Sequence, residues 1–317
     1  MVDPLLEFRR EFPVVEKTLY MISHSLGAMP QRTRACLNEY AELWSTRSIR
    51  AWEEGWWAMP VSVGDLIGRI IGAGPGEVVM QPNVSVAQWI IHSCLNWSGP
   101  RNKLVSEDLN FPTNIYIFHE LERQGARLVK VASEDGITAP LEKMLDAIDE
   151  QTLLVSVSHV IYRSSAIQDL GAIVRKAHAV GAMVVGDLYQ SAGTVPVDVK
   201  ALNLDFAVGG SVKWLCGGPG AGYLYVRPDH VAKLRPQLTG WMAHRESFGF
   251  AHGPIHYADD MFRFLHGTPA IPALYAAKSG YEIVLEAGVD RIREKSMRQT
   301  QWLVELAQEA GYLSAVR

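Results

Sequence analysis

The stretch Gly209-Gly210-Ser211-Val212-Lys213-Trp214-Leu215-Cys216-Gly217-Gly218-Pro219-Gly220 decides the fold assignment, because it sets one lysine between two groups of glycines. It follows the apolar segment Phe206-Ala207-Val208, which is typical of a buried strand. Glycine has no Cβ, so backbone in such a frame can approach a bulky group closely. Lys213 is therefore either a solvated loop residue between two turns or a reactive amine at a binding site.

The composition is that of a soluble globular protein. The chain has 317 residues, of which 48% are hydrophobic and 20% are charged, and its formal net charge is −4. This balance argues against a nucleic-acid or membrane partner, and no apolar run is long enough to cross a bilayer. The N-terminus is not a signal peptide, and three scattered cysteines form no disulfide or zinc pattern. We expect a cytoplasmic enzyme with two domains, or with one large domain and an appendage.

Strand and helix patterns alternate through the middle of the chain. A turn into a strand is expected over 76–80, and strands are expected over 104–106, 127–132, 153–158, 182–186, 205–208 and 222–226. Helices are expected over 63–71, 86–95, after 112, and over 141–148, 170–180, 273–287 and 291–310. This alternation predicts an α/β fold with a mostly parallel, doubly wound sheet and helices on both faces.

The two ends of the chain depart from this rhythm. A short helix is expected over 5–12, a strand over 19–22 and a helix from Pro30. Trp52, Trp56 and Trp57 lie close together, as core, as a subunit contact or as the wall of a ligand site. Residues 313–316 have the pattern of an opening strand without a partner, which suggests a truncated chain.

The strand that ends before Asn83 carries a candidate anion site. Ligands of open α/β sheets bind beyond the carboxyl ends of the strands. Here Asn83, Val84 and Ser85 lead into a helix, whose first N–H groups and a serine hydroxyl suit a phosphate. Ordinary N-capping by Asn83 or Ser85 explains the same residues.

Asp187 follows a fully apolar strand, where an unpaired carboxylate would be costly to desolvate. It is either an N-cap or the partner of a cation such as a protonated pyridine nitrogen, which keeps that ring an electron sink. Gln190 could reach the phenolic oxygen of the same ring. Lys213 follows the next strand, so Asp187 and Lys213 can share one edge of the sheet. A phosphate anchor, an acid and a lysine in this order predict a pyridoxal 5′-phosphate (PLP) site with Lys213 as the Schiff-base residue.

A series of short stretches through nearly the whole chain carries a family resemblance. They are His24-Ser25-Leu26-Gly27-Ala28, Ile49-Arg50-Ala51-Trp52 with Gly55-Trp56-Trp57, Phe111-Pro112-Thr113-Asn114, Ser158-His159-Val160 with Tyr162, Asp187-Leu188 through Pro196-Val197-Asp198, Lys213 with Gly217-Gly218-Pro219-Gly220, Gly240-Trp241, and Arg263-Phe264-Leu265 with Gly267-Thr268-Pro269. In these the chain resembles the PLP-dependent enzymes of fold type I, in the class V aminotransferase superfamily, and most closely the kynureninases.

The resemblance implies a PLP-dependent transferase-like fold of the aspartate aminotransferase type. Residues 61–269 would form the large PLP-binding domain. Residues 1–60 would contribute to a small domain and to dimer contacts, and 270–317 would form a long helix and the start of an incomplete C-terminal small domain. The resemblance also implies a homodimer with cofactor sites at the subunit interface, and no metal.

The resemblance assigns roles to individual residues. Lys213 would be the catalytic Schiff-base lysine, Asp187 would pair with the pyridine nitrogen, and Phe111 would stack on the ring. Trp241 and Thr268 would reach the phosphate of the neighbouring subunit's cofactor. The full set expected to bind the cofactor is Val84, Ser85, Phe111, Asn114, Ser158, Asp187, Gln190, Lys213, Trp241 and Thr268.

Kynureninases hydrolyse the Cβ–Cγ bond of kynurenine to anthranilate and alanine through aldimine and ketimine intermediates, a step of tryptophan catabolism. This chain departs from them at Val212, where they have tyrosine, at Gln190, where they have histidine, and at Asn114, where they have aspartate. Another class V activity (an aminotransferase, a cysteine desulfurase or a lyase) and a catalytically inactive homologue remain as alternatives. For the substrate carboxylate, Arg50 and Arg163 are the candidates.

Overall fold

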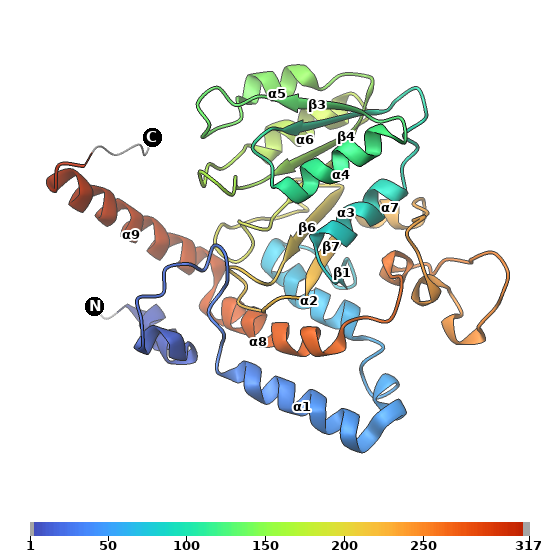
Figure 1. Ribbon diagram of the computed structural model, residues 1–317, viewed down its shortest axis with the longest axis horizontal. Helices are drawn as coiled ribbons and strands as arrows, with labels where there is room; N and C mark the ends of the chain where they lie inside the picture. The colour runs from blue at the N-terminus through green and yellow to red at the C-terminus, as the bar shows by residue number, and fades with distance from the viewer. Residues whose placement is uncertain (1–2, 313–317) are drawn as a thin grey trace.

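A seven-stranded sheet forms the centre of the protein in a computed structural model that describes residues 3–312 (Figure 1). Its strands are β1 (Val78–Gln81), β2 (Lys103–Glu107), β3 (Arg127–Val131), β4 (Thr152–Ser158), β5 (Met183–Asp187), β6 (Phe206–Gly210) and β7 (Gly222–Val226). Their order across the sheet is β1-β7-β6-β5-β4-β2-β3. Only β7 runs antiparallel to its neighbours, so the predicted mostly parallel sheet is confirmed.

Helices cover both faces of the sheet, as expected for a doubly wound fold. The helices on one face are α2 (Met59–Ile71), α5 (Leu141–Ala147), α6 (Leu170–Ala179) and α8 (Ile271–Ala287). The other face packs against α3 (Val84–Ser93) and α4 (Pro112–Glu122). Side chains alternate along each strand, so Val78 and Met80 join the first core while Val79 joins the second. Both faces are therefore buried, which explains the continuous apolar runs of the strands.

The N-terminal part of the chain packs against the helices rather than the sheet. Helix α1 (Arg32–Arg47) lies along α8, and the Arg32 guanidinium pairs with both Glu11 and Glu286. The remaining helices are α7 (Pro228–Val231), α9 (Val289–Glu309), and the 3₁₀ helices η1 (Pro4–Glu11), η2 (Pro13–Glu16), η3 (Ser48–Trp52), η4 (Trp241–Ala243), η5 (Ser247–Gly249) and η6 (Met261–Phe264). Among the residues described, no helix combines the length and the apolar character needed to cross a membrane.

The expected elements of the central region are present with bounds that shift by a few residues, whereas two expectations at the ends need comment. The strand expected over 19–22 is wrong, because this segment is a loop in which Leu19 is 91% and Met21 is 79% exposed. An apolar run becomes a strand only where another strand can bond its backbone. The strand expected over 313–316 lies outside the described residues.

The three clustered tryptophans divide between different surroundings. Trp56 is buried and stacks on Tyr40, while Trp52 meets it edge-on. Trp57 packs instead against Phe262 and Trp241. The first two therefore belong to the packing under α1, and Trp57 belongs to an aromatic cluster near η4.

Candidate active site

Six strands end at the same edge of the sheet, and five of them bring the candidate residues to it. Strands β2, β4, β5 and β6 are parallel, and β1 shares their direction because β7 lies antiparallel between β1 and β6. Ser158 and Asp187 are the last residues of β4 and β5, and Lys213 follows β6 by three residues. This is the edge at which ligands of such sheets bind.

Asp187 is a buried carboxylate held by two neutral donors. Its Oδ1 accepts the N–H of Tyr189 at 2.9 Å, and its Oδ2 accepts the Asn114 side-chain amide at 2.9 Å. Burial raises the pKa of Asp187, while these hydrogen bonds and the charge of Lys213 oppose the rise. A buried carboxylate of this kind would be stabilised by a cation such as a pyridinium nitrogen.

The Lys213 amine lies among aromatic rings. Its Nζ is 4.7 Å from the centroid of the Tyr189 ring and 5.6 Å from that of Phe111. Burial lowers the pKa of Lys213, and the negative charge of Asp187 partly opposes this. A lowered pKa increases the share of neutral amine, which is the nucleophilic form.

Asn110 is a site residue that the sequence reasoning missed, because it precedes the recognised motif at 111–114. Its Oδ1 accepts from the Asn114 amide at 2.8 Å, from the Phe111 N–H at 2.8 Å and from the Ser158 hydroxyl at 3.3 Å. Three expected cofactor residues are therefore linked through one buried amide. Asn114 in turn connects this group to Asp187.

Glu107 is a second residue of this network that the sequence reasoning missed. It is fully buried at the end of β2 and accepts the N–H of Ser158 at 2.9 Å. Burial raises the pKa of Glu107 to about 7, although hydrogen bonds from Ser158 oppose the rise. A buried polar residue at a strand end was the signal that could have identified it.

Gln190 connects the lysine segment to the N-terminal turn. Its Oε1 accepts the indole N–H of Trp214 at 2.8 Å, and its Nε2 donates to the His24 carbonyl at 3.3 Å. Gly27 of the same turn donates to the Val212 carbonyl at 2.7 Å. A Cβ at Gly27 would lie 2.0 Å from the Lys213 carbonyl oxygen, so only glycine permits this close approach.

The start of α3 has the features of an anion site. Asn83 is the N-cap, since its Oδ1 accepts the N–H of Val86 at 3.0 Å. Capping therefore explains Asn83 but not Ser85, which lies in the first turn. The N–H groups of Val84 and Ser85 have no acceptor within the helix, because an α-helix leaves its first donors free.

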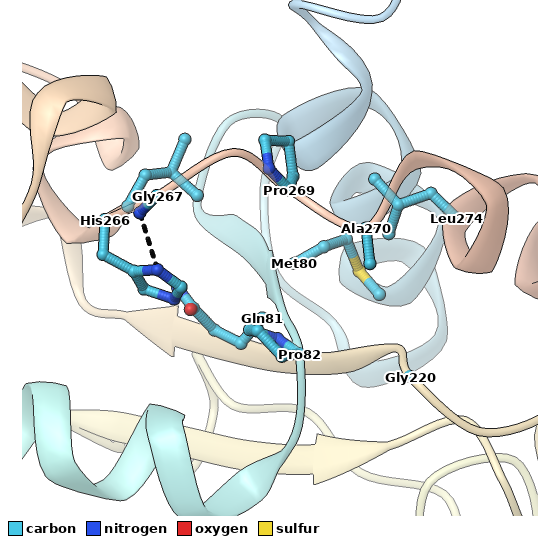
Figure 2. Close-up of a pocket in the computed structure, with 10 residues that line it drawn as sticks. Met80, Gln81, Pro82, Gly220, His266, Gly267, Pro269, Ala270 and Leu274 are labelled. Atoms are coloured by element: carbon cyan, nitrogen blue, oxygen red, sulfur yellow. Dashed lines mark hydrogen bonds between the residues drawn. The ribbon is translucent and has the colours of Figure 1, made fainter.

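Trp241 and Thr268 lie away from these contacts, on the segment that follows β7. The Trp241 ring packs against Trp57 and Phe250, and Thr268 is exposed. Figure 2 shows a pocket beside this segment, between the end of β1 and Gly267. The residues that line it are Met80, Gln81, Pro82, Gly220, Leu265, His266, Gly267, Pro269, Ala270 and Leu274.

The two candidate arginines lie in different surroundings. Arg50 lies in η3 and is exposed. The guanidinium carbon of Arg163 is 6.0 Å from the centroid of the Tyr162 ring, which meets Phe111 edge-on at 5.1 Å. Arg163 is therefore connected through two rings to the surroundings of Lys213.

The residues at this edge fit PLP. The buried Asp187 needs a cationic partner, the amide oxygen of Asn114 is buried without a hydrogen-bond partner in the described part of the chain, and α3 offers free N–H donors. The Lys213 amine is available for a Schiff base. When bound, PLP supplies an electron sink for the carbanion formed on an amino acid.

Comparison with known proteins agrees with this fit. A family model described as Aminotransferase class-V matches residues 65–316. The kynureninases of Deinococcus radiodurans and Burkholderia pseudomallei are 34% and 32% identical to this chain, and each match covers 96% of this chain and 74% of the relative. These relatives and the family support a PLP-dependent, kynureninase-like enzyme.

Solved structures share the fold. An apo cysteine desulfurase from Thermococcus onnurineus superimposes with a TM-score of 0.86 at 21% identity, covering 100% of this chain and 80% of that one. A mutant of C-DES, with glycine covalently linked to its PLP cofactor, gives a TM-score of 0.83 at 19% identity. The match covers 94% of this chain and 79% of that one. The predicted fold type is thus confirmed.

Proposed function

This chain belongs to the aminotransferase class-V family, and from that premise we propose that it hydrolyses the Cβ–Cγ bond of kynurenine or of a closely related amino acid. The observation that carries the proposal is that the Lys213 amine and the buried Asp187 carboxylate lie at one edge of the sheet, where the charge of each acts on the pKa of the other, in a chain that matches kynureninases over 96% of its length.

Each residue has a defined task in this proposal. Asp187 holds a proton at the ring nitrogen, and Asn114 and the Tyr189 N–H orient its two oxygens. Lys213, whose pKa is lowered by burial, accepts the proton of the substrate α-carbon and returns it later in the cycle. Phe111 would cover the ring on one side and keep water away from it.

The remaining assignments are part of the same proposal. Val84 and Ser85 would bind the phosphate at the start of α3, and Ser158 and Gln190 would contact the cofactor. Residues 61–269 would form the cofactor domain, with 1–60 and 270–317 contributing to a smaller one. The chain would act as a cytoplasmic homodimer in which Trp241 and Thr268 reach the neighbouring site.

Arg163 is the better of the two candidates for the substrate carboxylate. The rings of Tyr162 and Phe111 connect it to the surroundings of Lys213, while Arg50 has no such connection in the described part of the chain. Arg163→Gln should raise KM for the substrate at least several-fold more than Arg50→Gln does. Equal KM values for the two variants would refute this choice.

A cysteine desulfurase activity is disfavoured at Cys216. Burial raises the pKa of this thiol to about 11, so the nucleophilic thiolate is scarce at neutral pH. The Cys216 backbone also has φ of +52°, in a turn packed against Gly27. The cysteine nearest to Lys213 in sequence is therefore a packed thiol.

Absorbance and turnover test the proposal in two steps. Protein reconstituted with PLP should show a visible band that is lost in Lys213→Ala, and it should convert kynurenine to anthranilate, which is followed by fluorescence. A missing band would favour an inactive homologue. A normal band without anthranilate would favour another class V reaction, which a panel of amino acids would identify.

A further inference from the structure

Tyr189 lies at the centre of the site, and its aromatic ring has not yet been assigned a role. It stands two residues after Asp187, and its N–H donates to the Asp187 carboxylate. Its half-buried ring lies 4.7 Å from Lys213 Nζ, closer than the Phe111 ring at 5.6 Å. Two aromatic rings therefore border the space around the amine.

Gly210 makes room for the Tyr189 ring. A Cβ at Gly210 would lie 2.6 Å from both Cζ and Oη of Tyr189 and 2.7 Å from its Cε2. Atoms cannot approach this closely, so a side chain at position 210 would displace the ring. Glycine within a strand has an entropic cost and packs nothing of its own. At the end of β6, the ring of Tyr189 fills the space that a side chain at position 210 would occupy.

The ring presents a neutral surface to the amine. Burial, together with the nearby charge of Asp187, raises the pKa of the Tyr189 hydroxyl to about 12, so the phenol stays protonated at neutral pH. Any group bonded to Lys213 Nζ begins in the space bordered by Tyr189 and Phe111. A flat, positively charged pyridine ring gains stacking and cation–π attraction from such surfaces.

We propose that Tyr189 is a further cofactor-binding residue, whose ring stacks on the pyridine ring of PLP joined to Lys213, and that Gly210 is the residue that permits this position. The inference rests on the proposed PLP chemistry. It assigns the contact to the aromatic ring of Tyr189 and not to its hydroxyl.

Titration of the apoprotein with PLP, followed by the visible absorbance, tests this inference without measuring turnover. Tyr189→Ala and Tyr189→Leu should each bind PLP roughly threefold to tenfold more weakly, because they lose the aromatic face. Tyr189→Phe should stay within about twofold of the wild type, since it keeps the ring. Tyr116→Ala, which removes an exposed tyrosine from α4, is the matched control. Thermal unfolding of each apoprotein checks that the variants fold.

Gly210→Ala gives an independent readout through the packing of the two residues. Alone it should weaken PLP binding as Tyr189→Ala does, and in the Tyr189→Ala background it should add little, because the displaced ring is already gone. Unchanged or tighter binding by Tyr189→Ala and Tyr189→Leu would overturn the inference, as would a Tyr189→Phe protein that behaves like Tyr189→Ala. A wild-type chain that binds no PLP would overturn the proposed function as well.

Discussion

Asn114 is the residue through which the buried carboxylate at the centre of the site is oriented. One amide nitrogen donates both to Asp187 and to Asn110, and both bonds are buried. A donor that faces a carboxylate stabilises its ionised form, which the proposed pairing with a pyridinium nitrogen requires. An asparagine at this position therefore supports the task of Asp187 rather than adding a second negative charge.

Removing this amide should weaken cofactor binding. Asn114→Ala leaves Asp187 with the Tyr189 N–H as its remaining hydrogen-bond donor. A hydrogen bond to a charged group contributes about 1.5–3 kcal/mol, so PLP affinity should fall by at least about tenfold. Equilibrium titration of the apoprotein with PLP measures this affinity. Asn96→Ala, at an exposed asparagine, should bind PLP normally, and an equally normal Asn114→Ala would contradict this role.

Glu107 should make the stability of the fold depend on pH. Its pKa is raised to about 7 by burial, against about 4.3 in an unfolded chain. Between these values the folded state holds a proton that the unfolded state has lost, so stability falls as pH rises from about 4.3 to 7 and then levels off. At about 1.4 kcal/mol per pKa unit, the difference between about 4.3 and about 7 corresponds to a loss on the order of 3–4 kcal/mol.

Glu107→Gln checks this expectation, since a glutamine carbonyl can still accept the Ser158 N–H. The variant should lack this fall in stability and should be more stable than the wild type at pH 8, measured by urea unfolding. Glu150→Gln, at an exposed glutamate, should follow the wild-type curve. If the free energies of unfolding of the wild type and of Glu107→Gln change with pH in parallel, Glu107 does not titrate in this range.

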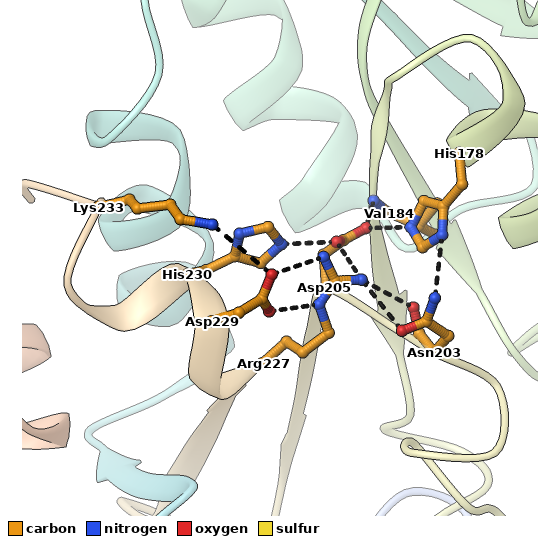
Figure 3. Close-up of polar contacts among 8 residues, drawn as sticks. All are labelled: His178, Val184, Asn203, Asp205, Arg227, Asp229, His230 and Lys233. Carbon is orange, nitrogen blue, oxygen red and sulfur yellow. Dashed lines mark hydrogen bonds and ion pairs between the residues drawn. The ribbon is translucent and has the colours of Figure 1, made fainter.

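At the scale of the elements, Asp205 ties together three strands at the edge opposite the candidate site (Figure 3). It precedes β6, accepts the Val184 N–H of β5 at 2.7 Å and pairs with Arg227, which follows β7, at 2.9 Å. The Nε2 atom of His178 lies 2.8 Å from Asp205 Oδ2, and the Nε2 atom of His230 lies 2.7 Å from Asp205 Oδ1. Burial would raise the pKa of Asp205, but these partners hold it below its ordinary value.

Breaking this cluster should destabilise the sheet. Asp205→Asn removes a buried charge from its partners and should cost on the order of 3 kcal/mol at pH 7. The pKa of Asp205 is lower in the folded than in the unfolded protein. Its charge therefore stabilises the fold fully above the unfolded pKa of about 3.9, and this stabilisation disappears as pH falls through the folded pKa. Urea unfolding should therefore show a smaller difference from wild type at acid pH. Asp229→Asn, at a half-exposed partner of Arg227, should cost much less.

At the scale of the whole molecule, the proposed homodimer assigns Trp241 to the neighbouring subunit's site. The Trp241 ring lies in an aromatic cluster with Trp57, Phe248 and Phe250, and the two phenylalanines are 61% and 67% exposed. A dimer would bury part of this apolar surface. Light scattering should then give about twice the chain mass of 35.1 kDa.

Mixing two inactive variants tests whether Trp241 acts across the interface. Lys213→Ala should be inactive alone, and Trp241→Ala should lose most PLP binding. In a mixed dimer, one site combines the intact Lys213 of one protomer with the intact Trp241 of the other. Remixing after mild dissociation should restore activity to that site. Mixtures no more active than the two separate variants would place Trp241 in its own subunit's site.

The sequence by itself determined the order of the elements and the chemistry at the strand ends. Apolar runs bounded by turns predicted the sheet, because a strand buried on both faces must be apolar throughout. Asp187 and Lys213 were identifiable for a similar reason, since a charge at the end of such a strand needs a partner. The pattern failed at 19–22, where a local apolar run has no strand beside it.

Only the tertiary structure decided which side chains meet. Asn110 and Glu107 join the site through hydrogen bonds to residues as many as 51 positions away, and no local pattern encodes such distances. Tyr189 gains its place beside Lys213 because Gly210, on the neighbouring strand, leaves the space empty. The glycine-framed lysine indicated the cofactor from the sequence, whereas the walls around it depend on the packing of separate strands.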